Sequence, residues 1–332
     1  MSGVINVLSI DGGGIRGIIP ARILQEIEKR TKKPIAELFH LIAGTSTGGI
    51  LALGLTKAGP NGRPQYPAEK LLEMYETEGA QIFSRSLWHR VTAIGSLIEE
   101  KYPSDGIETV LDEYFKQARL KDALTNVLIT SYEIERRNPF FFKSRKAKMG
   151  ADSDFLVKHV ARATSAAPTY FEPAQIKNGK NDYWALVDGG VFANNPAMCA
   201  YVEAKKNYPD ADDILVVSLG TGSLTRPLPY EEATGWGMAQ WAQPLLSVMF
   251  DGVSETVDYQ LGQLLPNSSD GQARYYRFQV RLDEGDDDMD NTTKTNLRVL
   301  RLLADGLIRD NSNNIDVLCG QLLDRCRLHP TK

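Results

Sequence analysis

The sequence predicts an α/β fold built on a mostly parallel central sheet, and two observations support this fold class. Two short apolar runs, VINVLSI at 4–10 and LFHLIA at 38–43, have the length and composition of buried strands, and each ends at a glycine-rich turn. An apolar segment that we expect to be helical follows each turn, at 18–30 and at 50–58. A repeated order of strand, glycine turn and helix is typical of parallel strands joined by crossover helices.

The rest of the chain continues this alternation. Three later runs are predicted to be strands: 126–134, 183–187 and 214–219. Helices are predicted for most of 60–120, for 155–164, for most of the chain after residue 228, and for a last amphipathic segment at 297–308. No internal repeat, low-complexity block or interdomain linker interrupts the pattern, so the sequence favours a single domain.

Composition and charge exclude several classes of protein. The 332 residues are 42% hydrophobic and 24% charged, as in ordinary globular proteins. A formal net charge of −4 gives no overall basic field for binding a nucleic-acid polymer. The three widely spaced cysteines form neither a disulfide framework nor a zinc pattern, which favours a reducing compartment. Because we find no signal-peptide pattern and no long apolar run, we expect a soluble, cytoplasmic protein.

The segment GTSTG at 44–48 matches the G-x-S-x-G pattern of a nucleophile elbow. A serine on a sharp turn between strand and helix projects its hydroxyl clear of the sheet, and Gly44 and Gly48 let the strained backbone pass without Cβ clashes. The following helix directs its N-terminal N–H groups toward the reacting centre. Ser46 is therefore the candidate nucleophile, with a purely structural Gly-Thr-Ser turn as the alternative.

A second glycine-rich turn, DGGGIRG at 11–17, has two interpretations. Gly12, Gly14 and Gly17 satisfy the G-x-G-x-x-G pattern of a dinucleotide site, which would make the protein an NAD(P)-binding oxidoreductase. That site also needs an acidic residue at the end of the second strand. Glu37 precedes the second strand instead of closing it, and the strand ends at the serine turn, so this interpretation is disfavoured.

The other interpretation of this turn is an oxyanion hole. Successive backbone N–H groups of Gly12, Gly13 and Gly14 would face the negative oxygen of a tetrahedral intermediate. Only glycines allow a substrate to approach the backbone so closely. Arg16 would either add a positive charge to this site or brace the loop.

The segment DGG at 188–190 supplies the candidate base. Asp188 ends a predicted strand, and Gly189 and Gly190 make the turn in which its carboxylate would reach Ser46. A serine triad of an α/β-hydrolase needs a histidine after the acid, but only His329 follows Asp188, in a polar tail. The other histidines are His40, His89 and His159. None stands in a catalytic pattern, so the sequence predicts a Ser-Asp dyad in which the aspartate takes the serine proton.

The order and spacing of these three motifs resemble the patatin-like phospholipase family. The blocks ATSAAP at 163–168, NNP at 194–196 and SLGTG at 218–222 are also similar to it. The resemblance implies a three-layer αβα fold with a nucleophile elbow on a mostly parallel sheet. It assigns residues 1–225 to the catalytic core and 226–332 to a C-terminal helical portion of the same domain.

The resemblance also implies a serine lipid acyl hydrolase of the phospholipase A or lysophospholipase type. Such an enzyme cleaves esters of membrane phospholipids or galactolipids in transient, peripheral contact with a membrane, without a metal or organic cofactor. Some bacterial relatives resemble anti-phage effectors that degrade the cell's own membrane once a cyclic oligonucleotide binds, so one alternative is the same chemistry in such an effector, with a cyclic oligonucleotide as a candidate activator. Residues 8–20 also resemble plant acyl hydrolases. A catalytically silent storage or binding protein is the alternative of another class.

Two segments outside the motifs could have a functional or a purely structural role. The apolar segment 236–250 is a candidate lid or membrane-contact helix, a candidate homodimer interface, or an ordinary core helix. The acidic segment DEGDDDMD at 283–290 does not match the spacing of an EF-hand, so we interpret it as a solvated loop and expect no metal site.

Overall fold

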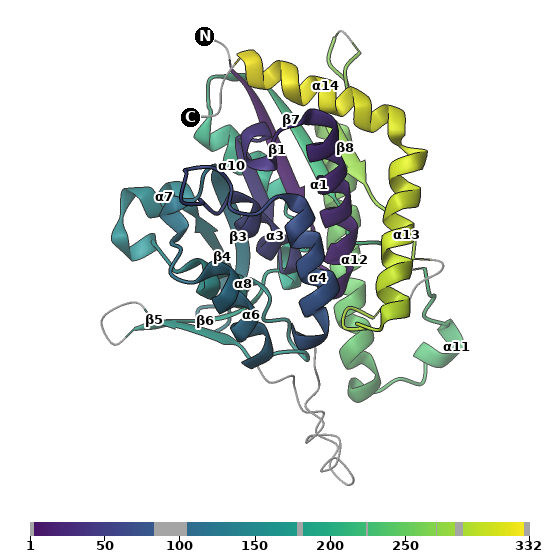
Figure 1. Ribbon diagram of the computed structural model, residues 1–332. Helices are drawn as coiled ribbons and strands as arrows, with labels where there is room; N and C mark the ends of the chain where they lie inside the picture. The colour runs from purple at the N-terminus through teal and green to yellow at the C-terminus, as the bar shows by residue number, and fades with distance from the viewer. Residues whose placement is uncertain are drawn as a thin grey trace.

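A single mixed sheet forms the centre of the protein (Figure 1). The computed structural model describes residues 3–82, 105–177, 182–223, 225–269, 271–282 and 288–328. Within these ranges the strands are β1 Gly3–Ile10, β2 Leu41–Gly44, β3 Asn126–Glu133, β4 Asn138–Lys143, β5 Ala174–Lys177, β6 Tyr183–Asp188, β7 Ala211–Leu219 and β8 Tyr275–Phe278. Their order is β5-β6-β3-β2-β1-β7-β8, and β4 pairs with β3.

The sheet is parallel at its centre and antiparallel at one side. Strand β1 is parallel to β2 and β7, β2 to β3, and β7 to β8. Strands β4 and β6 run antiparallel to β3, and β5 runs antiparallel to β6. Ile10 at the end of β1 pairs with both Gly44 and Leu219, so β1, β2 and β7 end at the same edge of the sheet.

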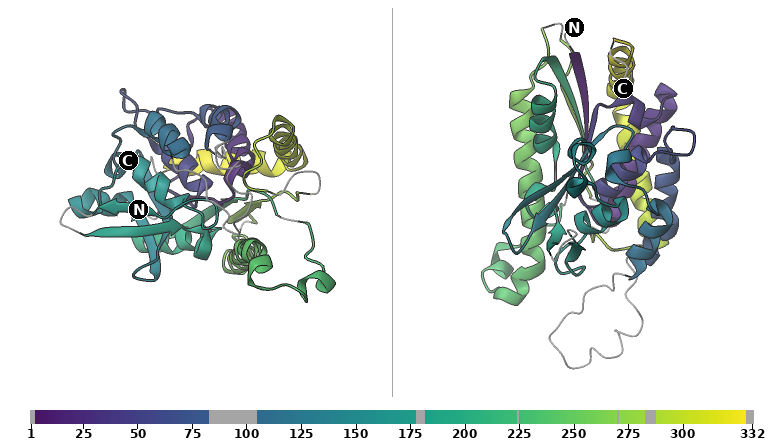
Figure 2. Two further views of the ribbon diagram at one scale, coloured as in Figure 1. Left: turned by 90° about the horizontal axis from the view of Figure 1, so that it is seen from below. Right: turned by 90° about the vertical axis from the view of Figure 1, so that its left-hand side faces the viewer.

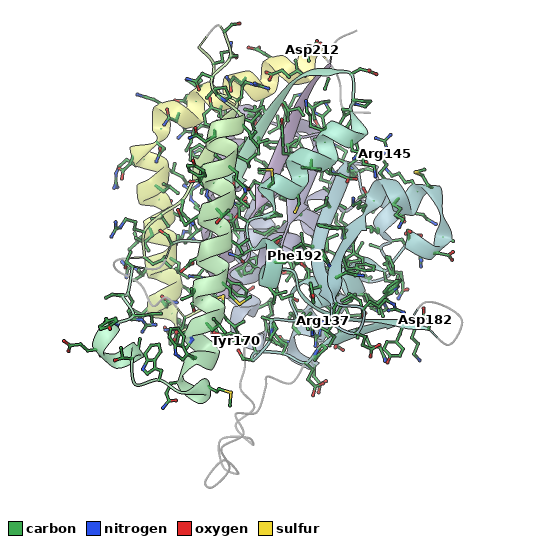
Figure 3. The ribbon with its side chains drawn as sticks, turned by 180° about the vertical axis from the view of Figure 1, so that it is seen from behind. Arg137, Arg145, Tyr170, Asp182, Phe192 and Asp212 are labelled. Atoms are coloured by element: carbon green, nitrogen blue, oxygen red, sulfur yellow. The ribbon has the colours of Figure 1, made fainter. Side chains whose placement is uncertain are left out.

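Helices cover both faces of the sheet and give three layers, which Figure 2 shows edge-on. One face carries α1 Ile18–Thr31, α2 Ile35–Leu38, α3 Thr47–Thr56, α4 Ala68–Ile82, α6 Asp105–Phe115, α8 Val157–Thr164, α13 Lys294–Asp310 and α14 Ser312–Leu328. The other face carries α9 Gly190–Ala193, α10 Ala197–Asn207 and α12 Met238–Leu264, with α12 nearest the viewer in Figure 3. The short helices α7 Ser144–Met149 and α11 Tyr230–Ala233 lie at the periphery.

Burial on both faces explains why the central strands are nearly continuous apolar runs. Successive side chains of β1 point to opposite faces. Leu8 and Ile10 pack in the core cluster under α1 and α3, whereas Ile5 and Val7 pack in the cluster under α10 and α12. Apolar side chains are therefore required at almost every position of such a strand.

The α/β fold class predicted from the sequence is confirmed, and the differences lie in short or peripheral elements. The predicted strands at 4–10, 126–134, 183–187 and 214–219 correspond to β1, β3, β6 and β7. Strands β4, β5 and β8 were not predicted, and β8 lies in the portion expected to be helical. Each has only four to six residues, too few for periodicity to separate a strand from a loop. Among the described residues, no helix is long and apolar enough to cross a bilayer.

Candidate active site

The predicted nucleophile lies on a strained turn between β2 and α3. Ser46 has a φ of 54°, in the left-handed region that residues with a side chain rarely adopt. Glycine is required on both sides, because a Cβ on Gly44 would overlap the Gly48 carbonyl and a Cβ on Gly48 would overlap the carbonyl of Ile10. The sequence-predicted roles of the two glycines therefore have a steric basis in the turn.

Threonine hydroxyls hold this turn from three neighbouring segments. The Ser46 N–H donates to Oγ1 of Thr164, at the end of α8, over 2.9 Å. The Thr45 hydroxyl donates to the Ala193 carbonyl at 2.6 Å, so it accepts from the Thr130 hydroxyl, also 2.6 Å away. Sequence reasoning did not assign a role to these threonines, although Thr164 lies in the ATSAAP block that supported the family resemblance.

The register of β3 explains how Asp188 reaches this turn. Strand β4 occupies one edge of β3 from residue 128 to 133, so β2 and β6 share the other edge. On that edge Gly44, the last residue of β2, pairs with Ile129, and Asp188, the last residue of β6, pairs with Ser131. Because β2 and β6 run in opposite directions, their carboxyl ends meet end to end.

Asp188 is buried against the Ser46 hydroxyl. Both residues line the same cavity, and the Oδ1 of Asp188 accepts the N–H of Gly190 at 2.7 Å. Asp188 is 2% exposed. Burial raises the pKa of the carboxyl from 3.8 to about 7, although the interactions with Ser46 and Gly190 lower it. A carboxyl that titrates near neutral pH can act as a proton acceptor at physiological pH.

The glycines after Asp188 are needed for close packing. A Cβ on Gly189 would overlap the side chain of Thr130 in β3. A Cβ on Gly190 would lie 3.0 Å from the ring of Phe250 and 3.1 Å from the Asp188 carboxylate. Both predicted glycines therefore lie within the site, between the candidate base and the residues that pack on it.

Gly12, the first glycine of the DGGG turn, forms hydrogen bonds through both its N–H and its carbonyl group. The Gly12 N–H donates to the Asn194 carbonyl at 3.0 Å, and the Gly12 carbonyl accepts the Thr221 hydroxyl at 2.6 Å. Gly12 nevertheless lies against the nucleophile, since a Cβ on it would be 3.2 Å from the Ser46 Cβ. In this structure the Gly12 amide is directed to Asn194 and not to the space in front of Ser46.

Gly13 and Gly14 line the cavity in front of Ser46. Gly14 has a φ of 59°, which favours glycine, and its neighbour Ile15 donates its N–H to the Met289 carbonyl at 2.9 Å. Of the two interpretations of Arg16, the structure supports a brace. Arg16 is buried, and its Nε donates to the Gly13 carbonyl at 3.3 Å.

The cavity is polar at one end and apolar elsewhere. Ser46, Asp188, Gly13 and Gly14 form the polar end. Its apolar lining includes Ile50, Ile107, Tyr170, Phe171, Phe250 and Met289. Its volume of about 40 Å³ is far below the roughly 300–1,000 Å³ of ordinary ligand pockets. An acyl chain therefore requires the apolar lining to move apart.

Two of these lining residues come from the segments that sequence analysis left open. Phe250 belongs to α12, so the apolar segment 236–250 contributes directly to the site. Met289 belongs to the acidic segment interpreted as a solvated loop, of which residues 283–287 lie outside the described residues. That interpretation is wrong for Met289, which packs on the glycine turn. No local pattern marks a single methionine between aspartates as part of a cavity.

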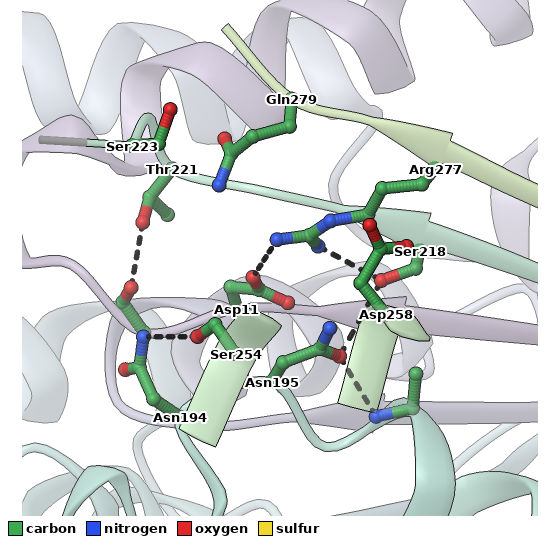
Figure 4. Close-up of polar contacts among 12 residues, drawn as sticks. Asp11, Asn194, Asn195, Ser218, Thr221, Ser223, Ser254, Asp258, Arg277 and Gln279 are labelled. Carbon is green, nitrogen blue, oxygen red and sulfur yellow. Dashed lines mark hydrogen bonds and ion pairs between the residues drawn. The ribbon is translucent and has the colours of Figure 1, made fainter. Parts of the chain in front are cut away.

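A buried ion pair anchors the start of the glycine turn (Figure 4). Nη2 of Arg277, in β8, lies 2.7 Å from Oδ2 of Asp11, and both side chains are buried. Arg277 also donates from Nη1 to the Ser218 hydroxyl at 2.9 Å, and that hydroxyl bonds to Asn195. Burial raises the pKa of Asp11 to about 6, although Arg277 lowers it. Sequence reasoning missed Arg277, which lies beyond every recognised motif.

The two described histidines lie away from the dyad. His40 precedes β2, at the end of the strand opposite Ser46, and its Nδ1 accepts the Asn6 N–H at 3.0 Å. His159 on α8 lines a separate cavity, and burial lowers its pKa. His89 and His329 lie outside the described residues. Within the described part of the chain, no histidine lines the Ser46 cavity.

Comparison with known proteins agrees with this geometry. The sequence model of one family, described as patatin-like phospholipase, matches residues 8–201. Patatin-like protein 4 of Arabidopsis thaliana is 31% identical over 93% of this chain and 84% of its own length. Patatin-like protein 2 of Oryza sativa is 32% identical over 97% and 88% of the two chains. A potato protein named probable inactive patatin-3-Kuras 1 is 31% identical over 99% and 95%.

Proposed function

The chain belongs to the patatin-like phospholipase family, and we propose that it is a serine lipid acyl hydrolase acting on carboxylic esters of membrane phospholipids or galactolipids. Family membership supports lipid acyl hydrolysis in general. The observation that carries the specific proposal is the pairing of Ser46 with the buried carboxyl of Asp188 at the polar end of an apolar cavity. A lipid ester has the same division into a polar reacting group and an apolar chain.

In the first half of the reaction, Asp188 accepts the proton of the Ser46 hydroxyl as Oγ attacks the ester carbonyl carbon. The N–H groups of Gly13 and Gly14, together with the N-terminus of α3, stabilise the negative oxygen of the tetrahedral intermediate. The intermediate collapses to an acyl-Ser46 ester. The departing alcohol, which is the rest of the lipid, takes the proton back from Asp188.

In the second half, Asp188 accepts a proton from a water molecule that attacks the acyl-serine carbonyl. Collapse of the second tetrahedral intermediate releases the fatty acid, and Ser46 regains its proton from Asp188. The same carboxyl thus serves both half-reactions, for which a pKa near 7 is suited at neutral pH. We assign the oxyanion role to Gly13 and Gly14 because the Gly12 amide is engaged with Asn194.

The test is fatty-acid release from mixed phospholipid and galactolipid vesicles, without added metal, by wild type and Ser46→Ala. Loss of a covalent nucleophile is expected to lower kcat by at least about a thousandfold. His159→Ala is the matched control, because His159 lies in a separate cavity, and it should keep wild-type activity. Equal activity of wild type and Ser46→Ala would remove Ser46 from the mechanism. Inactivity of both would favour a catalytically silent member of the family.

A further inference from the structure

Helix α12 carries a stripe of exposed apolar side chains along its N-terminal half. Met238 is 93% exposed, Leu245 and Val248 are each 48% exposed, and Met249 is 37% exposed. Leu245, Val248 and Met249 follow Met238 by 7, 10 and 11 residues, and in a helix with 3.6 residues per turn these positions lie on the same face as Met238. Trp241 is partly exposed and lies on the same face. We call these five residues the α12 face. Scattered exposed apolar residues are ordinary, but a continuous stripe is not.

The α12 face is not the side of the helix that holds the fold together. Phe250, Val257 and Leu261 are buried and lie on the opposite side, toward the sheet and the Ser46 cavity. The helix is therefore apolar on two sides, and among the described residues it is the side of Phe250, Val257 and Leu261 that packs in the core. Helix α11 and the start of α12 project beyond the body of the molecule in Figures 1 and 3.

The helical turn that ends the α12 face also contributes to the candidate active site from its other side. Met249, the last residue of the face, is followed directly by Phe250, which lines the cavity of Ser46. Tyr170, which also lines that cavity, lies beside the lower part of α12 in Figure 3. The α12 face and the cavity of Ser46 therefore lie on opposite sides of the same helix.

The charges around this face are unusual for a membrane-associated helix. The sequence has no lysine or arginine from residue 227 to residue 273, and Glu231 and Glu232 of α11 are exposed beside the face. Attraction to anionic lipids depends on lysine and arginine side chains near the membrane surface. The α12 face has no such residues in its own segment, so its chemistry fits uncharged or zwitterionic lipid.

The dimensions of the face argue against a second copy of the chain. Twelve residues of helix span about 18 Å, and a helix is about 10 Å wide, which gives a footprint on the order of 200 Å². A stable protein interface buries about 800 Å² on each partner. A bilayer requires no minimum area and no complementary shape. Tryptophan is also enriched where proteins meet the bilayer interface. Trp241 contacts Trp236 edge to face, with the two ring centroids 5.1 Å apart.

We propose that the α12 face seats the protein on a zwitterionic bilayer surface, while Phe250 on the other side of the same helix lines the Ser46 cavity. This inference rests on the proposed function, because it takes the substrate to be a membrane lipid. It assigns the segment 236–250 to membrane contact on one side of the helix and to the cavity on the other.

The test measures binding to phosphatidylcholine vesicles by co-sedimentation, with Ser46→Ala as the parent so that the vesicles stay intact. The variant Leu245→Gln, Val248→Gln, Met249→Gln is expected to partition at least about tenfold more weakly, because three half-exposed apolar side chains lose their contact with lipid. Thermal unfolding of the variant checks that the fold is retained. The matched control is Val202→Gln, Leu302→Gln, Val317→Gln, three comparably exposed sites on α10, α13 and α14, which should bind like the parent.

Three further experiments distinguish the proposal from its alternatives. Replacing part of the phosphatidylcholine with phosphatidylglycerol should not strengthen binding, and a several-fold gain would overturn the assignment to zwitterionic lipid. Unchanged vesicle binding by the α12 variant, with loss of a dimer in analytical ultracentrifugation, would make the face a homodimer interface and refute the proposal. Hydrolysis of a short, water-soluble ester by wild type tests the proposed function separately, since it needs no bilayer.

Discussion

Asp188 is predicted to govern both the pH dependence of catalysis and a pH-dependent part of stability. With a pKa of about 7, the carboxyl is about 9% ionised at pH 6 and about 91% ionised at pH 8. Only the ionised form can accept the Ser46 proton. We therefore expect kcat/KM on a water-soluble ester to fall about tenfold from pH 8 to pH 6, with one proton titrating.

The same carboxyl should destabilise the folded state at high pH. Its pKa is 3.8 when exposed and about 7 when folded, so between these values the folded state binds more protons than the unfolded state. Stability must then decrease as pH rises through this window. The difference of 7 − 3.8 = 3.2 pKa units corresponds to at most about 4 kcal/mol. Asp188→Asn removes the buried charge, so it should be inactive yet more stable than wild type at pH 8.

The assay compares urea unfolding of wild type and Asp188→Asn at pH 5 and pH 8. The stability gain of the variant should be largest at pH 8 and small at pH 5. Asp11, whose pKa is also raised, contributes to both proteins and cancels in the difference. Asp182→Asn, just before the start of β6, is the matched control and should not be more stable than wild type at pH 8, because it loses a half-exposed ion pair with Arg136. A flat rate profile from pH 5.5 to 8, or a variant less stable than wild type at pH 8, would refute the reasoning.

The remaining predictions concern the geometry around the dyad. Gly48→Ala should abolish ester hydrolysis and lower the urea midpoint, because its Cβ would overlap the Ile10 carbonyl of β1. The control Gly252→Ala, at an open site in helix α12, should raise the free energy of unfolding by about 0.5–1 kcal/mol. Ser46→Gly should be more stable than Ser46→Ala by about 1 kcal/mol in urea unfolding, since glycine adopts the positive φ without strain. Arg277→Gln should cost about 3–5 kcal/mol of unfolding free energy, because it leaves a buried carboxylate unpaired. Arg274→Gln, which breaks a more exposed pair, should cost at most about 1 kcal/mol.

Each of these comparisons has a result that would contradict it. An active, stable Gly48→Ala protein would mean that the turn tolerates a side chain. Equal stability of Ser46→Gly and Ser46→Ala would mean that no strain is stored at the nucleophile. Equal costs for the two arginine substitutions would mean that burial of the Asp11 pair does not matter to stability.

Local chemistry made the polar end of the site predictable from sequence. Ser46, Asp188 and the glycines around them each lie in a turn whose backbone demands particular residue types, and such demands appear as short motifs. The elbow glycines illustrate this. A Cβ on Gly44 or Gly48 would overlap a backbone carbonyl, so glycine is required there whatever side chains the neighbouring residues carry. The sequence could not show that the Gly12 amide is bonded within the protein, since its hydrogen bond to Asn194 joins residues 182 positions apart.

The apolar end of the site depends on packing between distant segments, which leaves no motif. Phe250 lies on a helix with two apolar sides, and sequence periodicity does not say which side faces the cavity. Met289 is a single apolar residue in an acidic loop, and Arg277 lies in a four-residue strand at the sheet edge. Each acquires its role only when β8, α12 and the glycine turn are brought together.

The end-to-end arrangement of β2 and β6 explains why two residues can suffice for this chemistry. Both strands lie on one edge of β3, and their last residues pair with Ile129 and Ser131, two positions apart. Two residues of strand correspond to about 6.6 Å, so β3 sets the separation of the two carboxyl ends. The intervening Thr130 bonds to the turn before Ser46 and packs on Gly189 after Asp188. In the proposed mechanism, a carboxylate delivered directly to the serine in this way needs no histidine between them, and its burial supplies the basicity that the histidine of a triad would otherwise provide.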